Sequence, residues 1–353
     1  MDFSTQIIEW YRTNKRDLPW RKTKNPYQIW LSEIILQQTR VEQGLSYYLK
    51  FIEKYPSIKD LANAPQDEVL KLWQGLGYYS RARNLHYTSK VITDKYKGEF
   101  PATYKEILDL KGIGEYTAAA ISSFSFNLPY PVIDGNVYRV LSRVFDIDTP
   151  IDSTLGKKEF KELAYELINK NNPSEYNQAI MEFGALYCKP QSPDCENCIF
   201  TSTCLAFKTK KINELPVKSK KLKQKNRYFN YLVFIDEDYT YLKKRTHKDI
   251  WHGLFDFPLI ETPKKIDNIL NNQQEGYSFL FKNHLSIKKS EEQIHILSHQ
   301  KIHATFWTVK QKNLTTPTNG LIKVDLKDIN NYPVPKLIEN YLSQNLKNCT
   351  FDI

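Results

Sequence analysis

Two acidic residues of this chain lie in sequence settings that drive their ionisation in opposite directions. Glu33 lies within IWLSEIILQQ (29–38), which is almost entirely apolar around it, and Asp134 precedes Gly135-Asn136 at the start of an amphipathic segment. Burial among apolar side chains raises a carboxyl pKa and keeps the acid protonated, whereas a carboxylate that caps a helix is held ionised. Such a pair can cleave a glycosidic bond through an oxocarbenium-like transition state. The alternative for Glu33 is a solvent-facing position on a partly exposed helix.

Four cysteines lie within seventeen residues, with the spacing C-x6-C-x2-C-x5-C: Cys188, Cys195, Cys198 and Cys204. The chain shows no secretion signal, so disulfides are not expected. Four thiolates this close can hold either a tetrahedral zinc ion or an iron–sulfur cluster. Structural zinc sites commonly pair two C-x2-C units and only one is present, so the spacing favours a cluster. Cys349 is expected to be an isolated thiol.

Two glycines interrupt a helical pattern at KGIG (111–114). The spacing of apolar residues predicts one helix before this stretch, over 104–110, and another from Glu115 onward. A glycine hairpin between helices bares backbone N–H groups at a helix N-terminus, with no Cβ to keep a phosphate away. An ordinary helix–helix turn would also use glycines. The residues expected to bind a phosphate are Lys111, Gly112 and Gly114.

Length and charge bound the possible classes of protein. A chain of 353 residues can form two domains. Of its net charge of +10, +8 comes from residues 208–227, which hold nine basic side chains and one acid. This stretch is expected to be a flexible linker that either tethers two domains or tracks phosphates. The longest uncharged run, Tyr116–Ile133, contains serines and two prolines, which argues against a membrane span. We therefore expect an intracellular, cytoplasmic protein.

The spacing of apolar residues changes along the chain. Residues 1–207 follow a helical period, for example in Val137, Val140, Leu141 and Val144. Beyond the linker, the aromatic and β-branched stretches 228–235 and 240–246, and the region 294–310, predict strands. The second domain is therefore expected to be α/β or α+β.

Taken together, these motifs resemble the helix-hairpin-helix DNA glycosylases of the endonuclease III superfamily, most closely the MutY branch of adenine DNA glycosylases. The similarity extends through RDLPWR (16–21), SEIILQQTRV (32–41) and GLGYYSRAR (75–83), and covers nearly all of residues 10–207. It implies an all-α helix-hairpin-helix glycosylase domain with an iron–sulfur cluster loop, followed by a smaller α/β Nudix-like domain. The implied boundaries are a six-helix barrel module at 26–135, an iron–sulfur module from 1–25 and 136–207, the linker at 208–227, and an 8-oxoguanine recognition domain at 228–353.

The resemblance also implies roles for the acids. Glu33 would protonate the adenine leaving group, Asp134 would stabilise the cationic sugar, and Asn136 would help to orient the site. Bifunctional members of the superfamily carry a Schiff-base lysine two residues after the last glycine of the hairpin, where this chain has Tyr116. A phenol cannot form an imine with the sugar. The resemblance therefore implies a monofunctional glycosylase that does not cleave the strand.

Further residues are assigned to DNA by the resemblance, because a buried base must leave the stack before an enzyme can act on it. Tyr78 would wedge beside 8-oxoguanine, and Gln38 would fill space in the opened duplex. Thr39 is expected to be a further substrate-binding residue. The residues expected to hold the extruded adenine are Leu18, Trp20, Arg21, Val41 and Gln178.

The second domain resembles Nudix domains loosely, through HGLFDFPLI (252–260). The glutamate-rich Mg²⁺-binding signature of Nudix hydrolases is missing, so we expect a domain that reads a base without hydrolysing a nucleotide. The loop LSHQ (297–300) is similar to the lesion-sensing loop of the family, with Ser298 and His299 as candidate contacts to 8-oxoguanine. The family often has phenylalanine where this chain has Leu297.

The implied cofactor is one [4Fe-4S] cluster held by the four cysteines, and the implied partner is double-stranded DNA containing A·8-oxoguanine or A·G mispairs. We expect a monomer associated with the nucleoid, with contacts to repair factors through the basic linker. Two other functions are compatible with the motifs: a related glycosylase for oxidised pyrimidines or G·T mismatches, and a non-catalytic protein that senses damage. The LSHQ loop argues against the first, and the intact Glu33 and Asp134 argue against the second.

Overall fold

The computed structural model describes residues 2–219, 224–270, 284–311 and 320–345. Its chain forms two compact units. The first, called the helical unit here, comprises Met1–Asn63 and Asn84–Lys221, and the second unit comprises Ala64–Arg83 and Leu222–Ile353. The second unit therefore includes a short stretch of the helical sequence besides the C-terminal part of the chain. Cys349 lies outside the described residues.

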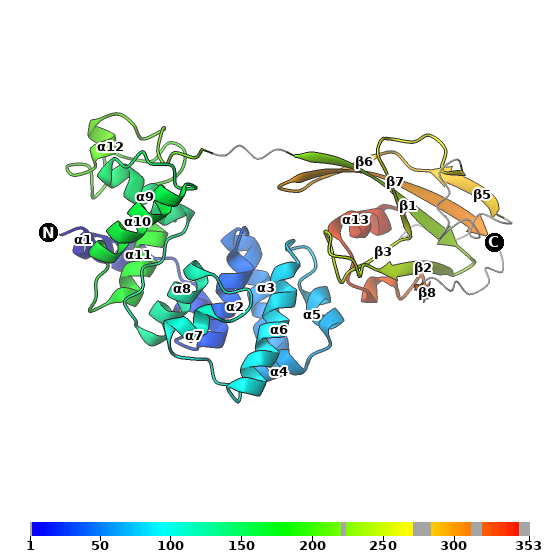
Figure 1. Ribbon diagram of the computed structural model, residues 1–353, viewed down its shortest axis with the longest axis horizontal. Helices are drawn as coiled ribbons and strands as arrows, with labels where there is room; N and C mark the ends of the chain where they lie inside the picture. Colours follow the sequence, from blue (N-terminus) through cyan, green and yellow to red (C-terminus); the bar gives the residue numbers. More distant parts are fainter. Residues whose placement is uncertain (1, 220–223, 271–283, 312–319, 346–353) are drawn as a thin grey trace. The chain divides into compact units, whose positions relative to one another are not determined.

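The described part of residues 1–207 contains helices and loops, which confirms the all-α prediction (Figure 1). The helices are α1 (Phe3–Asn14), η1 (Pro19–Arg21), α2 (Pro26–Leu36), α3 (Val41–Lys54), α4 (Ile58–Asn63), α5 (Gln66–Leu72), α6 (Ser80–Lys95), α7 (Tyr104–Leu108), α8 (Glu115–Phe126), α9 (Gly135–Phe145), α10 (Thr154–Leu167) and α11 (Pro173–Leu186), followed by α12 (Leu205–Lys208). The break between α7 and α8 falls at the predicted glycine hairpin.

Local sequence signals set the starts of the two helices that carry the acids. Helix α2 begins after Asn25, whose side chain accepts a hydrogen bond from the Tyr27 N–H, and Pro26 occupies the first helical position. Helix α9 begins after Asp134, which accepts from the Val137 N–H at 2.8 Å. These caps fix the position of each helix N-terminus, and Asp134 is itself one of the predicted catalytic residues.

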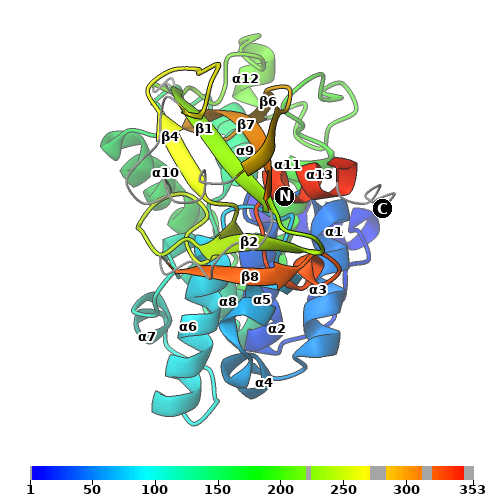
Figure 2. The ribbon, with the colours of Figure 1, turned by 90° about the vertical axis from the view of Figure 1, so that its right-hand side faces the viewer.

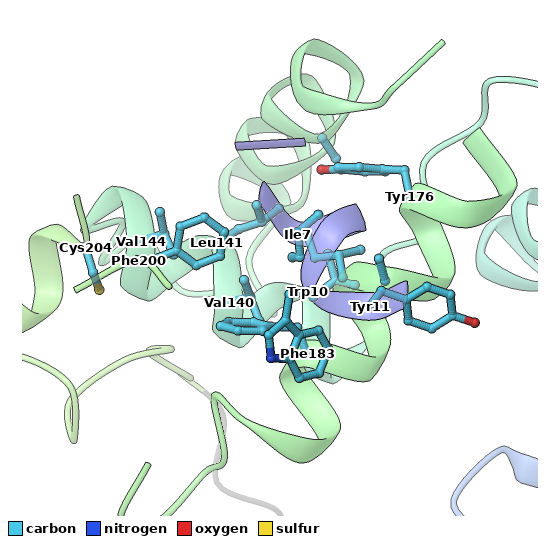
Figure 3. Close-up of a cluster of buried hydrophobic side chains, with 14 of the residues drawn as sticks. Ile7, Trp10, Tyr11, Val140, Leu141, Val144, Tyr176, Phe183, Phe200 and Cys204 are labelled. Carbon is cyan, nitrogen blue, oxygen red and sulfur yellow. The ribbon is translucent and has the colours of Figure 1, made fainter. Parts of the chain in front are cut away.

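A hydrophobic core joins α1, α9, α10 and α11 in the helical unit (Figure 3). The Trp10 and Phe183 rings meet edge-to-face with centroids 5.0 Å apart, and Phe200 packs against Phe183 at 5.4 Å. Cys204 is buried in the same core. The loop that carries the four cysteines is thus anchored to the core that also holds α9.

The second unit contains two sheets and the helix α13 (Lys336–Asn345) (Figures 1 and 2). The larger sheet has the order β4-β1-β7-β5, with β6 also pairing with β7, and β1 runs parallel to β7. The smaller sheet has the order β3-β2-β8. The strands are β1 (Lys225–Ile235), β2 (Tyr239–Lys244), β3 (Phe255–Asp256), β4 (Leu259–Thr262), β5 (His284–Lys289), β6 (Gln293–Ile296), β7 (Gln300–Gln311) and β8 (Leu321–Asp325). This arrangement confirms a mixed α/β unit.

The strands β1 and β2 follow one another across the acidic turn at 236–238, yet they belong to different sheets. Strand β1 is buried along its last seven residues, as expected for a central strand covered on both faces. Among the described residues, no helix is long and apolar enough to cross a membrane.

Candidate active site, cysteine pocket and DNA-binding surfaces

A cleft of about 840 Å³ in the helical unit gathers most of the predicted catalytic and base-binding residues. It is lined by side chains from η1, α2, α8, α9 and α11, and by the loop after α2. The predicted residues found along it are Leu18, Trp20, Arg21, Glu33, Gln38, Thr39, Val41, Tyr116, Asp134, Asn136 and Gln178. Residues up to 160 positions apart in the sequence therefore share one cleft.

Glu33 is buried, with 7% of its surface exposed. The loss of water around it raises its pKa to about 7, and the nearby charge of Asp134 acts in the same direction. The Tyr116 hydroxyl donates a hydrogen bond of 2.7 Å to Glu33 Oε2 and partly opposes this rise. The predicted burial and the upward pKa shift of this acid are both confirmed.

Asp134 caps α9 as predicted, but the direction of its pKa shift differs from the expectation. Its Oδ1 accepts from the Val137 N–H, and its Oδ2 accepts from Asn136 Nδ2 at 2.8 Å. Burial nevertheless outweighs these hydrogen bonds and raises the Asp134 pKa above its ordinary value. The prediction that capping alone would hold the pKa down was wrong, because the sequence does not show how much water the cleft walls exclude.

Arg139 joins this site to the cysteine loop, a connection that the sequence did not indicate. Its Nη2 donates to Asn136 Oδ1 at 2.8 Å and to the Gly184 carbonyl at 2.6 Å, and its Nε donates to the Cys188 carbonyl at 2.8 Å. Arg139 lies one turn after Asn136 on α9, so the helical period could have predicted that these two side chains share a face of the helix. The orientation of Asn136 thus depends on a guanidinium that also holds the first cysteine.

A second feature missed from the sequence is a carboxylate at the far side of the cleft. Glu182, with 1% of its surface exposed, receives paired hydrogen bonds from Arg16 and Arg21 at 2.6 to 2.9 Å. Burial alone would raise the Glu182 pKa, but the bonds from the two arginines outweigh it and lower the pKa to about 2. This pairing fixes Arg21, which also lines the cleft.

The four cysteines of the C-x6-C-x2-C-x5-C motif line a single pocket between α9, α11 and α12: Cys188, Cys195, Cys198 and Cys204. Arg143 is buried there, and its Nη1 lies 3.5 Å from Cys188 Sγ. Its other bonds go to the carbonyls of Lys189, Pro190 and Leu215. In the described part of the chain, no three His, Cys, Asp or Glu side chains lie close enough together to hold a single metal ion. Four sulfur donors around one pocket beside a buried cation fit an anionic iron–sulfur cluster.

The glycine hairpin presents backbone at the surface. Gly112 has φ +82°, and a Cβ there would lie 2.6 Å from Asn84 Cβ, so the position favours glycine. Gly114 precedes the first residue of α8, and a Cβ at Gly114 would meet nothing within 4 Å. Lys111 is exposed, and its ammonium lies 4.5 Å from the centre of the Tyr87 ring. The hairpin therefore offers an open helix N-terminus next to a positive charge.

The remaining predicted residues lie in the second unit around a pocket of about 390 Å³, called the second-unit pocket here. Residues 76–80, 249–251 and 296–300 line it together with Arg83. Tyr78 and Ser298 form a hydrogen bond through their hydroxyl groups, and His299 lies on the same hairpin as Ser298. The structure thus brings Tyr78 together with the LSHQ loop, although 220 residues separate Tyr78 from Ser298.

Comparisons with known proteins agree with this arrangement. Residues 31–168 match the model of the HhH-GPD superfamily of base excision DNA repair proteins, and residues 230–344 match the NUDIX domain model. A thermostable thymine-DNA glycosylase is similar in structure, with a TM-score of 0.55 and 32% identity over 59% of this chain and 95% of its own. An endonuclease III–DNA complex, at 24% identity and a TM-score of 0.51, shares the fold. The helical unit is that of a helix-hairpin-helix base excision repair glycosylase.

Similar proteins from other organisms narrow this class. The adenine DNA glycosylase of Buchnera aphidicola from Baizongia pistaciae is 37% identical over 88% of this chain and 87% of its own length. The adenine DNA glycosylase of Buchnera aphidicola from Schizaphis graminum is 35% identical over 96% of this chain and 97% of its own length. The human adenine DNA glycosylase is 41% identical over 58% of this chain and 39% of its own. This chain belongs to the adenine DNA glycosylase family of base excision repair.

Proposed function

We propose that this protein removes adenine paired with 8-oxoguanine or guanine in double-stranded DNA by hydrolysing the N-glycosidic bond, without cleaving the strand. The observation that carries the proposal is the placement of Glu33, Tyr116 and Asp134 around one cleft, where burial raises the Glu33 pKa to about 7. An acid beside a second carboxyl group suits departure of a base through an oxocarbenium-like state.

Glu33 acts as the general acid in this proposal. Tyr116 donates to Oε2, so the proton of the neutral acid is carried by Oε1 and can be given to a ring nitrogen of the extruded adenine. A pKa of about 7 matches this task, because a useful fraction of the group stays protonated at neutral pH while the proton remains easy to transfer.

Asp134 stabilises the positive charge that develops on the sugar as the base leaves. Asn136 donates to one carboxylate oxygen and the α9 N-terminus donates to the other, so both oxygens are fixed in place. Burial raises the Asp134 pKa in the free protein. The positive charge that develops on the sugar would favour the ionised form of this carboxyl group.

The wall of the cleft offers a place for the flipped base. Arg21, fixed by Glu182, and Gln178, whose Oε1 accepts from the Tyr11 hydroxyl at 2.8 Å, provide oriented polar groups. Gln38 has a left-handed backbone at φ +58° just after α2, as expected of a residue held at a functional turn. We assign Gln38 and Thr39 to the opened duplex. The residues assigned to the adenine are Leu18, Trp20, Arg21, Val41 and Gln178.

Tyr116 limits the chemistry to base removal. A strand-cleaving glycosylase needs an amine that forms an imine with the sugar, and a phenol cannot do so. Borohydride should therefore trap little or no covalent complex with DNA, while a Tyr116→Lys variant should be trapped. Efficient trapping of the wild-type protein would contradict the proposal.

We assign one [4Fe-4S] cluster to the pocket lined by Cys188, Cys195, Cys198 and Cys204. The four thiolates would hold the cluster, whose bonds to them would stabilise the conformation of the loop 188–204. Arg143 provides compensating positive charge, and Arg139 ties the loop backbone to α9. Protein purified without oxygen should contain about four irons per chain. Stoichiometric zinc in their place would overturn this assignment.

DNA docking involves both units. Lys111, Gly112 and Gly114 are assigned to a backbone phosphate, supported by the open helix N-terminus beside them. Tyr78, Ser298 and His299 are assigned to the purine opposite adenine, supported by their common pocket. We infer that the protein works as a monomer on nucleoid DNA in the cytoplasm, with the basic stretch 208–227 available for phosphates or repair factors.

Release of free adenine from defined duplexes tests the function. Duplexes with adenine opposite 8-oxoguanine, guanine or cytosine should be compared under single-turnover conditions, with thymine release from a G·T duplex as a further arm. The proposal expects the fastest release from A·8-oxoguanine, and no release of thymine. Thymine release instead would favour the activity named for the structurally similar thymine-DNA glycosylase.

A further inference from the structure

The second-unit pocket has a wall that the sequence motifs did not indicate. Residues 249–251, in the loop between β2 and β3, line the pocket that also contains Tyr78 and Ser298. Its volume of about 390 Å³ is in the range of small-molecule sites. Ile250 and Trp251 supply apolar and aromatic surface to it.

Two aromatic residues around this pocket have an uncommon backbone conformation. Tyr78 has φ +47° and Trp251 has φ +58°, both in the left-handed region that bulky side chains rarely adopt. Such conformations persist where the surrounding structure enforces them, and they concentrate at binding sites. Tyr78 is also half exposed, whereas Trp251 is buried and packs edge-on against Phe229 and His295.

Partly buried ion pairs hold this wall in place. Arg227, whose side chain is 11% exposed, donates to both carboxylate oxygens of Asp249 at 2.8 Å. The same guanidinium donates to Gln300 Oε1 at 3.0 Å, so one residue connects the loop to the hairpin that carries Ser298. Arg245 adds bonds to Asp249 Oδ2 and to the Ile250 carbonyl. The two walls are therefore fixed relative to each other before a ligand binds.

A further contact ties the loop to the stretch that contains Tyr78. Arg83 donates to the His252 carbonyl at 2.6 Å. The pocket thus has rigid apolar and aromatic walls, with a hydroxyl from Ser298 and an imidazole from His299 at its edge. Flat walls with a few hydrogen-bonding groups at the edge suit a planar heteroaromatic base, which is held by its faces and distinguished by its edge.

We propose that the loop 249–251 is a specificity element: Ile250 and Trp251 form the far wall of a pocket that takes the purine opposite the target adenine. This inference rests on the proposed function and goes beyond it, since it assigns recognition of that base to a second loop. Ser298 and His299 contact the edge of the base, and the loop limits the space left for it.

The test compares a pocket-filling substitution with a matched one outside the pocket. Ile250→Trp reduces the space, whereas Ile294→Trp places the same side chain on β6, where Ile294 is exposed and does not line the pocket. Binding is measured with duplexes that carry 2′-fluoro-2′-deoxyadenosine, which resists excision, opposite 8-oxoguanine or opposite a tetrahydrofuran abasic analogue. The abasic duplex has no base to enter the pocket.

We expect Ile250→Trp to raise the Kd for the 8-oxoguanine duplex by about tenfold and to leave the Kd for the abasic duplex unchanged. Ile294→Trp should bind both as the wild type does. An equal loss on both duplexes, or no loss on either, would overturn the proposal. If Ile250→Trp does not fold, Ile250→Ala is tested instead. The proposal then requires that Ile250→Ala prefers 8-oxoguanine over guanine less strongly than the wild type does.

Different measurements distinguish failure of the proposed function from failure of the proposed role of the loop. Adenine release by the wild-type protein from a cleavable A·8-oxoguanine duplex decides the function, whereas the comparison of variants on the uncleavable duplexes decides the role of the loop. A wild type that excises adenine normally, with an Ile250→Trp variant that binds normally, would reject the loop alone.

Discussion

The hydroxyl of Tyr116 on α8 donates a hydrogen bond of 2.7 Å to Oε2 of Glu33 on α2, joining residues 83 positions apart. Burial raises the Glu33 pKa, and the hydrogen bond from the phenol partly opposes this rise. The bond therefore favours the ionised form of Glu33. In the proposed mechanism, the residue that prevents strand cleavage therefore also adjusts the pKa of the acid that releases the base.

Tyr116→Phe should move the alkaline limb of the pH–rate profile. In the proposed mechanism adenine release requires protonated Glu33, so the rate of the wild type should fall as the pH rises through about 7. Removing the hydrogen bond raises the Glu33 pKa, and the limb should then move to higher pH. The measurement is the single-turnover rate between about pH 5 and pH 9. An unchanged limb, or a move to lower pH, would show that the phenol does not act on this proton.

Glu33→Gln should abolish base removal but preserve binding. The amide has nearly the shape of the protonated acid, yet it cannot supply a proton, so the rate should fall by about 10²- to 10⁴-fold. The Kd for A·8-oxoguanine duplexes should stay within about threefold. Glu42→Gln is the control, because Glu42 lines the same cleft in an exposed position. Turnover close to that of the wild type would remove Glu33 from the mechanism.

Local sequence was sufficient for features that depend on neighbours along the chain. The apolar residues around Glu33 predicted its burial, Asp134 before Gly135 predicted a helix cap, and KGIG predicted the break before α8. Each of these depends on a few consecutive residues. The strands at 228–235 and 240–246 were predicted in the same way: the first lies within β1, and the second overlaps β2, which ends two residues earlier, at Lys244.

Features that depend on distant residues could not be predicted in this way. The bonds from Arg16 and Arg21 to Glu182 span more than 160 residues, and nothing in either segment indicates the other. The Asp134 pKa was mispredicted for the same reason, because the cap is local but the exclusion of water comes from the whole cleft. The two sheets of the second unit also depend on long-range pairing, such as that of β1 with β7.

Substitutions at Asp134 should separate its structural role from its chemical role. Asp134→Asn keeps an oxygen that can accept from the Val137 N–H, so the fold should lose little stability. Asp134→Ala removes the cap and should lower the free energy of unfolding by about 1 kcal/mol. Both should lose most adenine release, because neither carries a negative charge beside the sugar. Urea unfolding and the release assay measure the two effects, and an active Asp134→Asn variant would contradict the charge-stabilising role.

Glu182→Gln should destabilise the helical unit in a pH-dependent way. Breaking a buried ion pair costs about 3–5 kcal/mol, since Arg16 and Arg21 lose a carboxylate shielded from water. Glu175→Gln is the matched control: its pair with Arg12 is more exposed, so the expected loss is below about 1 kcal/mol. The folded-state pKa of Glu182 is about 2, against about 4.3 for an unfolded glutamate. The stability it contributes is therefore present above the unfolded value and is lost as the pH falls towards 2. Urea unfolding should give a difference in the free energy of unfolding between wild type and variant that is constant above about pH 5 and shrinks below about pH 4. A difference that does not change with pH would mean that lost packing, and not the charge, is responsible.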